Sequence, residues 1–270
     1  MGNRLPPWKL NLANVRRTPG ERTANTRRTR KIGVAMGIRP GNTKLGVLVH
    51  HWSIPSGLRD ICVGASSLCL MLCYAMRQHY HRQTVKDALA RNYQESLRKD
   101  FVSVVCGWLR SLFARVVRVH ASGEFYSKEY VEKWIEIAKR NRRIEFYAYT
   151  RSWRNPEIYP ALIQLSRMPN FTLWWSCDKE TGAPPRIKGI RRAYLMVNDQ
   201  DVPKYWVDLV FREKTKTQMK WVNGALVCPP ENGITKTTCS HCQLCWSKKD
   251  MPREKIREVA HEYETSGSPG

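Results

Sequence analysis

The stretch RVVRVHASGEFYSKEYVEKWIEIAKRNRRIEFYAYT, residues 115–150, carries the pattern that decides the fold. Its first part, residues 115–124, is rich in valine and predicts a strand that ends in a polar loop. Ser127 can then cap a helix with one apolar face. That face consists of Tyr130, Trp134, Ile137 and Ala138. Residues 144–150 predict a second strand, so the stretch is a strand–helix–strand unit with a right-handed crossover.

The same alternation continues on both sides of this unit. Upstream, the pattern predicts a strand or hairpin at residues 42–55 and one or two amphipathic helices at residues 84–112. Downstream it predicts a helix at residues 155–168, with Asn155 as N-cap and Pro156 at its first position. Further strands are predicted at residues 171–177, 191–197, 207–211 and 220–228. Roughly six strands suit a partial or distorted (β/α) barrel, or else an open doubly wound sheet.

We expect the first of these folds, α/β with a partial barrel and a cysteine-rich C-terminal extension. The 270 residues are enough for a sizeable core, and we divide the chain into four regions. They are a flexible basic arm (1–41), a barrel-like domain with an N-terminal cysteine loop (42–225), a four-cysteine metal-binding segment (226–250) and a tail (251–270).

The charge of the chain is strongly positive and unevenly placed. The formal net charge is +23, and residues 1–44 hold eleven Lys or Arg but one acidic residue, Glu21. Such a segment predicts contact with nucleic-acid phosphates, although a solvated tail has the same composition. The candidate contacts are Arg16, Arg17, Arg27, Arg28, Arg30 and Lys31. No apolar run is long enough to cross a membrane and no secretory leader is visible, so we expect a protein of the cytoplasm.

Seven of the nine cysteines fall into two tight groups, which indicate metal binding in a reducing compartment. The C-terminal group, Cys228, Cys239, Cys242 and Cys245, has the spacing C-x10-C-x2-C-x2-C. This spacing favours a [4Fe–4S] cluster, with zinc as the alternative. His241 lies within the run and could tune or replace a ligand, although an exposed loop residue is the alternative. Cys106 lies in a helical pattern and is expected to be a buried apolar residue.

The N-terminal group, Cys62, Cys69 and Cys73, has the spacing C-x6-C-x3-C and is followed by Tyr74. Three thiolates leave one iron of a cubane cluster open, the arrangement that radical S-adenosylmethionine enzymes use to bind their cofactor. Those enzymes usually space the ligands C-x3-C-x2-C, whereas this chain places its third cysteine upstream. His79 or His81 is a candidate fourth ligand, and a structural zinc site or unliganded cysteines are the alternatives.

Polar residues follow four successive strands, and the carboxyl ends of parallel strands meet at one edge of a sheet. Glu124 is the residue that we most expect to meet the amino group of a bound cofactor, so it is also our catalytic candidate. The other cofactor contacts that we predict are Tyr74, Gly123 and Ser152. A magnesium-dependent nuclease is a different possibility, in which Glu124, Asp178 and Asp199 converge.

The chain resembles the phage "gene product eighty-eight" family, a group of cysteine-rich proteins of undefined reaction. The resemblance covers about residues 40–250 and rests on several motifs that occur in one order. They are NTKLG, SIPSG, CVGASSLCLMLCYA, RVHASGEFYSKEYVEKWIEIA, FYAYTRSW and CSHCQLCW. One departure is Val63, where family members more often have proline. The resemblance implies that the seven grouped cysteines are the family's and that Gly123, Glu124, Tyr149 and Ser152 lie in its recurring motifs.

The leading hypothesis is therefore a phage-type iron–sulfur protein of the host cytoplasm, with one or two [4Fe–4S] clusters. It includes chemistry like that of radical S-adenosylmethionine enzymes, on a nucleic acid or nucleotide. The rival hypothesis is a non-enzymatic nucleic-acid-binding protein whose metal sites only hold the fold.

Overall fold

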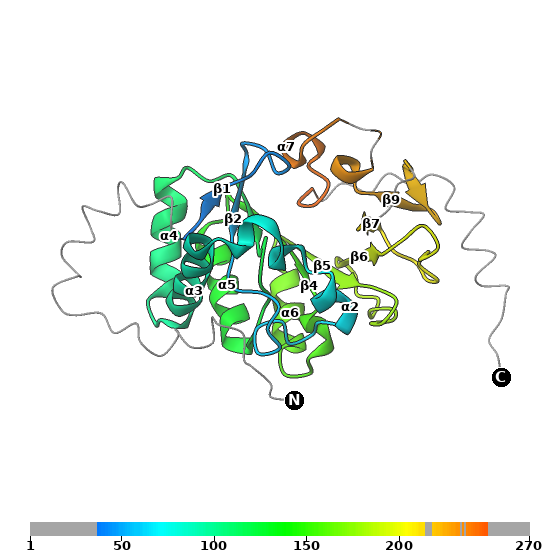
Figure 1. Ribbon diagram of the computed structural model, residues 1–270. Helices are drawn as coiled ribbons and strands as arrows, with labels where there is room; N and C mark the ends of the chain where they lie inside the picture. Colours follow the sequence, from blue (N-terminus) through cyan, green and yellow to red (C-terminus); the bar gives the residue numbers. More distant parts are fainter. Residues whose placement is uncertain (1–36, 214–217, 233, 235, 248–270) are drawn as a thin grey trace, which may run out of the picture.

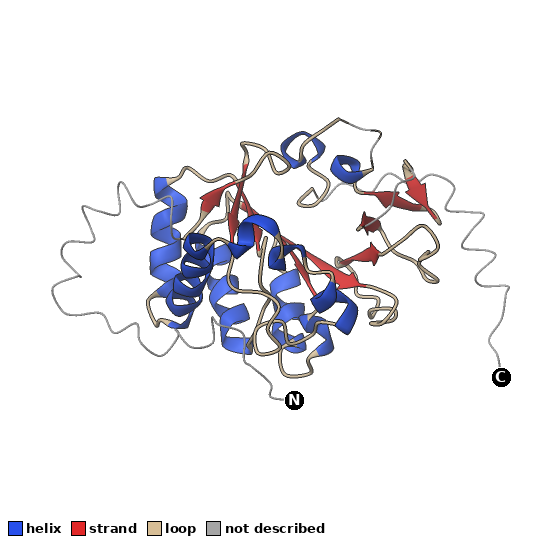
Figure 2. Cartoon of the chain, in the orientation of Figure 1, coloured by secondary structure: helices blue, strands red, loops and turns tan. Residues whose placement is uncertain are grey.

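The computed structural model describes residues 37–213, 218–232, 234 and 236–247. The six basic candidates of the arm and the expected tail lie outside these residues. Figures 1 and 2 show the described part as a central sheet with helices gathered mainly along one of its faces.

Nine strands form one sheet in the order β1-β2-β3-β4-β5-β6-β7-β9-β8. The first five are β1 (Arg39–Pro40), β2 (Val49–Trp52), β3 (Val116–Val119), β4 (Glu145–Thr150) and β5 (Phe171–Cys177). The other four are β6 (Arg191–Met196), β7 (Leu209–Arg212), β8 (Trp221–Val222) and β9 (Ala225–Val227). Strands β2 to β7 and β9 run parallel to one another. At the two edges of the sheet, β1 pairs antiparallel with β2 and β8 pairs antiparallel with β9.

The expected α/β class is confirmed, and the sheet is open rather than closed into a barrel, because β1 and β8 are its edges. The parallel strands follow one another in chain order without a reversal. A doubly wound sheet needs such a reversal, so that alternative is wrong. The expected boundary between residues 225 and 226 lies within β9, which pairs with β7 in the same sheet.

The described α-helices are α2 (Ser67–Met71), α3 (Gln83–Leu97), α4 (Phe101–Ser111), α5 (Lys128–Arg140), α6 (Tyr159–Ser166) and α7 (Cys239–Cys242). Of these, α4, α5 and α6 cover one face of the sheet. The apolar faces of α4, α5 and α6 bury Leu109, Trp134 and Leu162 in the main core. Ser127 caps α5 as predicted, because its side chain accepts a hydrogen bond from the Tyr130 backbone N–H.

Alternation along the strands gives the sheet two different faces. In β3, Val117 and Val119 belong to the core under the helices, whereas Val116 packs with Tyr147 and Trp246 on the opposite face. In β5, Leu173 is likewise on the helix side, and Trp174 packs on the opposite side. That second face is covered in part by the C-terminal segment that carries α7 (Figure 1).

The predicted helix at residues 155–168 is shorter than its sequence pattern indicates. Helix α6 begins at Tyr159, with Ile158 at the N-cap. The Asn155 side chain instead accepts hydrogen bonds from the N–H groups of Glu157 and Ile158. These bonds close a turn before the helix begins, a local alternative that asparagine commonly offers. Upstream, residues 42–55 supply one parallel strand, β2, rather than a hairpin of their own.

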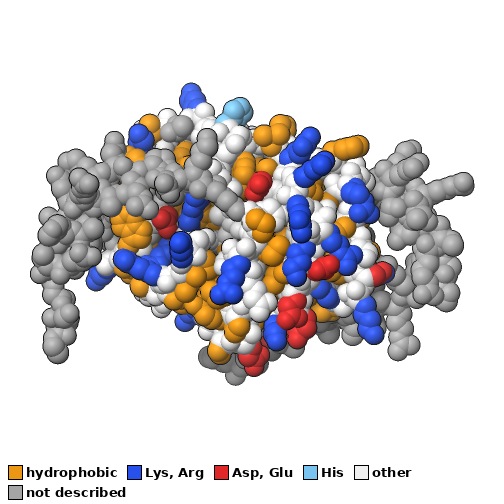
Figure 3. Space-filling model, turned by 180° about the vertical axis from the view of Figure 1, so that it is seen from behind, with side chains coloured by type: hydrophobic (Ala, Val, Ile, Leu, Met, Phe, Trp, Pro, Cys, Tyr) orange, Lys and Arg blue, Asp and Glu red, His pale blue; other side chains and the backbone are white. Residues whose placement is uncertain are grey.

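The surface carries positive charge outside the arm as well. Lys and Arg side chains are spread across the face of the described part seen in Figure 3. Among the described residues, none of the helices has the length and apolar character that spanning a bilayer requires.

Candidate functional site

A large cavity lies on the sheet face opposite the main helices, at the carboxyl ends of the parallel strands. Its volume is about 630 Å³, within the range of small-molecule and cofactor sites. The loop after β2, the ends of β3, β4 and β5, and the segment around Lys44 all line it. The three cysteines of the N-terminal group and Glu124 share this lining, as the sequence predicts for a cofactor site.

The cysteine loop is held against the ends of β4 and β5 by several specific contacts. Ser66 accepts the Cys69 N–H as the N-cap of α2, and its hydroxyl donates to Asp178 Oδ2 over 2.6 Å. The Leu68 N–H donates to Glu180 Oε2 over 2.9 Å. Gly64 lies so close to the end of β4 that an added Cβ would be 1.8 Å from the Arg151 carbonyl oxygen. The path of the loop is therefore fixed by the sheet.

Cys62 and Cys69 are in an environment that favours the protonated form of their thiols. Burial and, to a smaller extent, the neighbouring Glu124 raise the pKa of the Cys62 thiol to about 12. Burial also raises the pKa of Cys69, which Arg151 partly opposes. The Cys73 Sγ lies 3.7 Å from the Ser56 hydroxyl. A metal bound here has to displace protons, so its affinity depends on pH.

Glu124 is buried and follows β3, with its carboxylate fixed by backbone donors. Its Oε1 accepts the Phe125 N–H over 2.9 Å, and its Oε2 accepts the Arg151 N–H over 2.6 Å. Burial raises the pKa of Glu124, although these hydrogen bonds and the Arg151 charge oppose the rise. Glu124 thus lines the cavity, held by backbone N–H groups that follow β3 and β4, and its charge acts on Cys62 and Cys69.

The three other predicted cofactor contacts differ in their placement. Gly123 lines the cavity with φ +92°, and an added Cβ would be 2.2 Å from Ile54 Cγ1, so this position requires glycine. Tyr74 also lines the cavity and is 50% exposed, so the cavity reaches the surface there. Ser152 does not line the cavity. It is fully buried, and its hydroxyl donates to the Phe125 carbonyl oxygen over 2.7 Å, which fixes the chain around Glu124.

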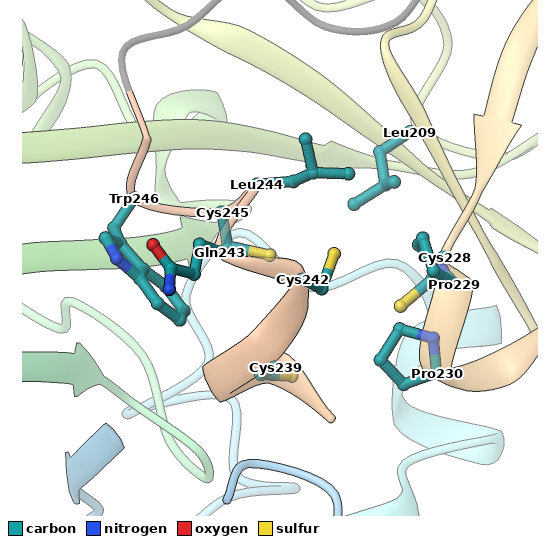
Figure 4. Close-up of a pocket in the computed structure, with 10 residues that line it drawn as sticks. All are labelled: Leu209, Cys228, Pro229, Pro230, Cys239, Cys242, Gln243, Leu244, Cys245 and Trp246. Atoms are coloured by element: carbon teal, nitrogen blue, oxygen red, sulfur yellow. The ribbon is translucent and has the colours of Figure 1, made fainter. Parts of the chain in front are cut away.

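The four C-terminal cysteines surround a second, small pocket (Figure 4). Cys239 and Cys242 come from α7, Cys245 comes from the turn after it, and Cys228 faces them from the end of β9. Gln243 ends α7 with φ +58°, a left-handed residue that turns the chain toward Cys245. Residues distant in sequence are therefore brought together as the spacing predicts.

This pocket is anchored to the sheet by aromatic side chains. The Tyr149 hydroxyl donates to Cys245 Sγ over 2.8 Å, and the Trp174 indole N–H donates to the Cys245 carbonyl oxygen over 2.9 Å. Trp246 packs on Tyr147, with ring centroids 5.4 Å apart. Burial raises the pKa of the Cys245 thiol to about 12, which the Tyr149 hydrogen bond partly opposes. Burial likewise raises the pKa values of Cys228, Cys239 and Cys242.

The cysteines within each group line a common pocket or cavity, a different one for each group. Their sulfur atoms do not yet form a complete set of metal ligands. The described residues contain no group of three or more His, Cys, Asp or Glu side chains arranged to hold a metal ion. All nine cysteines are free thiols, so no disulfide competes for them. Thiolate sulfur is a ligand that soft metals prefer, so the cysteines of each group suit such a metal. Their side chains would have to move closer together to bind it.

The remaining candidates do not join either cysteine group. Asp178 is fully buried and paired with Arg151 at 3.0 Å, and Asp199 pairs with Arg212 at 3.6 Å, so these acids serve different ion pairs. His81 and His241 are exposed, and the side chain of His79 is outside the described part. Cys106 is 3% exposed in the main core, as expected.

Sequence reasoning missed the basic side chains in the cavity wall. Arg118 lies within β3 and lines the cavity, and Lys44 lines it from the loop before β2, paired with Glu231. Arg118 stands between Val117 and Val119, so a single charged residue inside an apolar strand was the available signal. His120, one residue past β3, is 3% exposed with φ +68°, and burial lowers its pKa to about 3.

These features define a class of protein: a mixed α/β chain with an open, mainly parallel sheet and two cysteine groups on one sheet face. The chain belongs to the Gene product 88 family, whose sequence model matches residues 18–248. It is 26% identical to the Gene 88 protein of Mycobacterium phage L5 over 223 residues, covering 76% of this chain and 85% of that protein. The Gene 88 protein of Mycobacterium phage D29 is also 26% identical, over 227 residues and with the same coverage. No solved structure matches this chain.

Proposed function

We propose that this phage-type protein is an iron–sulfur enzyme that binds S-adenosylmethionine at the N-terminal cysteine group, on a sheet of the partial-barrel type. The observation that carries the proposal is that Cys62, Cys69, Cys73 and Glu124 line one cavity. They reach it from the loop after the first parallel strand, β2, and from the loop after the next, β3. Neither loop alone supplies both the three cysteines and the glutamate.

The strand order supports the partial-barrel assignment. Strands β2 to β7 add in chain order, and α4, α5 and α6 cover the same face of the sheet. In (β/α) barrels all crossovers are right-handed, so every helix lies outside and the strand ends face a common site. An open sheet of this kind leaves its inner face available for ligands.

Particular residues fit the proposed cofactor. Cys62, Cys69 and Cys73 would each bind one iron of a [4Fe–4S] cluster, and the remaining iron would take the amino and carboxylate groups of S-adenosylmethionine. Glu124 would accept a hydrogen bond from that amino group, since the Phe125 and Arg151 N–H groups hold its carboxylate in place. When bound, such a cofactor supplies one-electron cleavage of a carbon–sulfur bond.

The C-terminal group would hold a second metal site. Four thiolates can saturate a [4Fe–4S] cluster or a tetrahedral zinc ion, so this site has a structural or electron-transfer role rather than an open ligand position. Cys228 directly follows β9 and Cys239 and Cys242 belong to α7, so a metal there would fasten α7 to the end of the sheet. Zinc is the alternative metal for both groups.

The proposal is tested by anaerobic purification, with iron, sulfide and zinc measured for the wild type and two triple variants. One variant is Cys62→Ala/Cys69→Ala/Cys73→Ala and the other is Cys239→Ala/Cys242→Ala/Cys245→Ala. We expect about eight irons and about eight sulfides in the wild type and about half in each variant. The Cys106→Ala protein is the matched control and keeps its iron, because Cys106 is buried in the core away from both groups.

The second measurement is the cleavage of S-adenosylmethionine by the reduced, iron-loaded protein. Cleavage that is lost in the first triple variant and kept in Cys106→Ala supports the enzyme. Zinc without sulfide in the wild type, or a fully loaded protein that cleaves no S-adenosylmethionine, contradicts it. The substrate class that we propose is a nucleic acid or nucleotide, because the chain has a net charge of +23.

A non-enzymatic nucleic-acid-binding protein with structural metal sites is the second candidate, favoured by that charge and by the eleven Lys or Arg among residues 1–44. A variant that starts at Gly37 tests it. The Gly37 N–H donates to the buried Asn92 side chain over 2.8 Å, so this truncation preserves the first described contact of the fold. Loss of nucleic-acid binding with unchanged metal content supports this candidate, and binding that does not weaken with salt contradicts it.

A further inference from the structure

We propose that the cavity has an oxyanion-binding region around Arg118, which takes the phosphate or carboxylate group of a small molecule. The inference rests on the proposed function, because it gives the chemical class of the molecule held beside the proposed cofactor.

The position of Arg118 is fixed by the sheet and by two neighbours. Its strand neighbours Val117 and Val119 pack under the helices, so its side chain extends from the opposite face and lines the cavity. Its Nε donates to the His120 carbonyl oxygen over 3.2 Å, and its guanidinium carbon lies 5.6 Å from the centre of the Tyr149 ring. The guanidinium is therefore oriented before any ligand arrives, which lowers the entropic cost of binding.

Arg118 differs from two other cationic residues of the cavity because it lacks a carboxylate partner among the described residues. Arg151 is paired with Asp178 at 3.0 Å, and Lys44 is paired with Glu231. Arg118 donates one hydrogen bond, from Nε, and within the described part its two terminal nitrogens have no acceptor. Their N–H groups form the fork that binds a carboxylate or phosphate by two parallel hydrogen bonds.

The electrostatic neighbours of Arg118 include Cys245 of the C-terminal group, and also Tyr74, which follows the N-terminal group. The Arg118 charge acts on Cys239 and Cys245, and lowers the pKa of each of these thiols against the larger effect of burial. Arg151 has the corresponding effect on Cys69. Lys44 also acts on Cys239, so two cations lie beside the C-terminal group. Lys44 is paired with Glu231, which leaves Arg118 as the one of these two without an ion-pair partner in the described chain.

The surroundings of Arg118 also suit the rest of a small molecule. Tyr149 and Phe211 line the cavity as an edge-to-face pair, with ring centroids 5.1 Å apart.

Isothermal titration calorimetry on the as-purified, full-length protein tests the inference with four probes. They are 5′-adenosine monophosphate, inorganic phosphate, citrate and uncharged adenosine. The first two identify a phosphate ligand, and citrate identifies a carboxylate ligand. We expect at least one of the three anions to bind the wild type, and Arg118→Gln to weaken that binding about 10- to 100-fold. The anion affinity of Arg118→Lys should lie between those of the wild type and Arg118→Gln, because lysine keeps the positive charge but lacks the two parallel N–H donors of arginine.

The matched control is Arg115→Gln, which removes an exposed arginine three residues earlier on the chain and should bind like the wild type. Any binding of anions by the arm is common to all variants, so the difference between them reports on the cavity. Equal binding by Arg118→Gln and the wild type overturns the inference, as does an equal loss in Arg115→Gln. No anion binding, or adenosine binding as tight as that of its phosphate, overturns it too.

The titration does not depend on metal loading, so it separates this inference from the proposed function. A protein that binds anions through Arg118 but contains no iron keeps the oxyanion site and contradicts the iron–sulfur assignment. A protein that contains iron and sulfide at both groups but binds no anion supports the iron–sulfur assignment and overturns the oxyanion site.

Discussion

The hydroxyl of Tyr149 donates a hydrogen bond to the sulfur of Cys245 over 2.8 Å, and this bond joins the wall of the large cavity to the C-terminal cysteine pocket. Tyr149 belongs to β4 and Cys245 to the turn after α7, so the contact connects residues 96 positions apart. A molecule in the cavity and a metal in the pocket would therefore share one side chain between them.

We predict that Tyr149→Phe weakens metal binding at the proposed C-terminal site without unfolding the protein. The phenol fixes the orientation of Cys245, and the loss of a residue that orients a metal ligand typically lowers metal affinity about 10- to 100-fold. The lost hydrogen bond should reduce the free energy of unfolding by about 1 kcal/mol. Iron release to a chelator and urea denaturation measure the two effects. Tyr159→Phe is the control, because Tyr159 stacks on Trp175 near the helices, and unchanged iron release in Tyr149→Phe contradicts the prediction.

We predict that Gly64→Ala displaces the N-terminal cysteine loop. The added Cβ would be 1.8 Å from the Arg151 carbonyl oxygen, which is backbone and cannot rotate away. We expect a loss of about 1–3 kcal/mol in the free energy of unfolding together with loss of iron from this group.

Gly107→Ala is the matched control for that change. Gly107 lies inside α4, and an added Cβ would meet nothing within 4 Å. This variant should be more stable by about 0.5–1 kcal/mol, because alanine is the better helix former. Thermal denaturation and iron analysis of both variants provide the comparison, and equal behaviour of the two glycines would show that the loop is not tightly held.

Below neutral pH, His120 should make the protein less stable. Burial lowers its pKa from 6.5 to about 3, so between these values the unfolded chain binds more protons than the folded one. The stabilising contribution is therefore present above pH 6.5 and is lost as the pH falls. Between pH 7 and 5 we expect His120 to account for a loss of about 2 kcal/mol in the free energy of unfolding.

The variant His120→Asn tests this pH dependence, since asparagine tolerates the positive φ of +68° at this position. Its free energy of unfolding should change less between pH 7 and 5 than that of the wild type, as measured by urea denaturation at both pH values. Burial lowers the pKa of His51 to about 4, so part of the wild-type slope remains in the variant. An identical slope in both proteins contradicts the assignment to His120.

Neutralising the six basic candidates of the arm should reduce the salt dependence of nucleic-acid binding. If Arg16, Arg17, Arg27, Arg28, Arg30 and Lys31 each contact a phosphate, replacing all six by glutamine lowers the slope of log affinity against log salt by up to about 5. Fluorescence anisotropy with a labelled duplex at several salt concentrations measures the slope. An unchanged slope means that other basic residues, such as those on the described surface (Figure 3), make the contacts.

Much of the fold could be predicted because its elements are locally encoded. Strand β5 occupies residues 171–177 as predicted, and Ser127 caps α5, since runs of aromatic and β-branched residues and helix caps act over a few residues. The start of α6 was misjudged, because the Asn155 side chain closes a turn that periodicity does not reveal. The open sheet and its strand order were not decided by local pattern, because pairing between distant strands depends on packing of the whole chain.

For the candidate site, too, some features could be predicted from the sequence and others depended on the tertiary structure. The sequence by itself determined the two cysteine groups and the position of Glu124 after a strand, because ligand spacing and strand ends are properties of neighbouring residues. Tertiary structure alone decided that Cys62, Cys69, Cys73 and Glu124 share a cavity, and that Cys228 faces α7 across a pocket. It also decided that Arg118 faces the cavity without a carboxylate partner in the described chain, while Arg151 is neutralised by Asp178. Charge pairing depends on which side chains meet after the sheet has formed, and a one-dimensional pattern does not contain those distances.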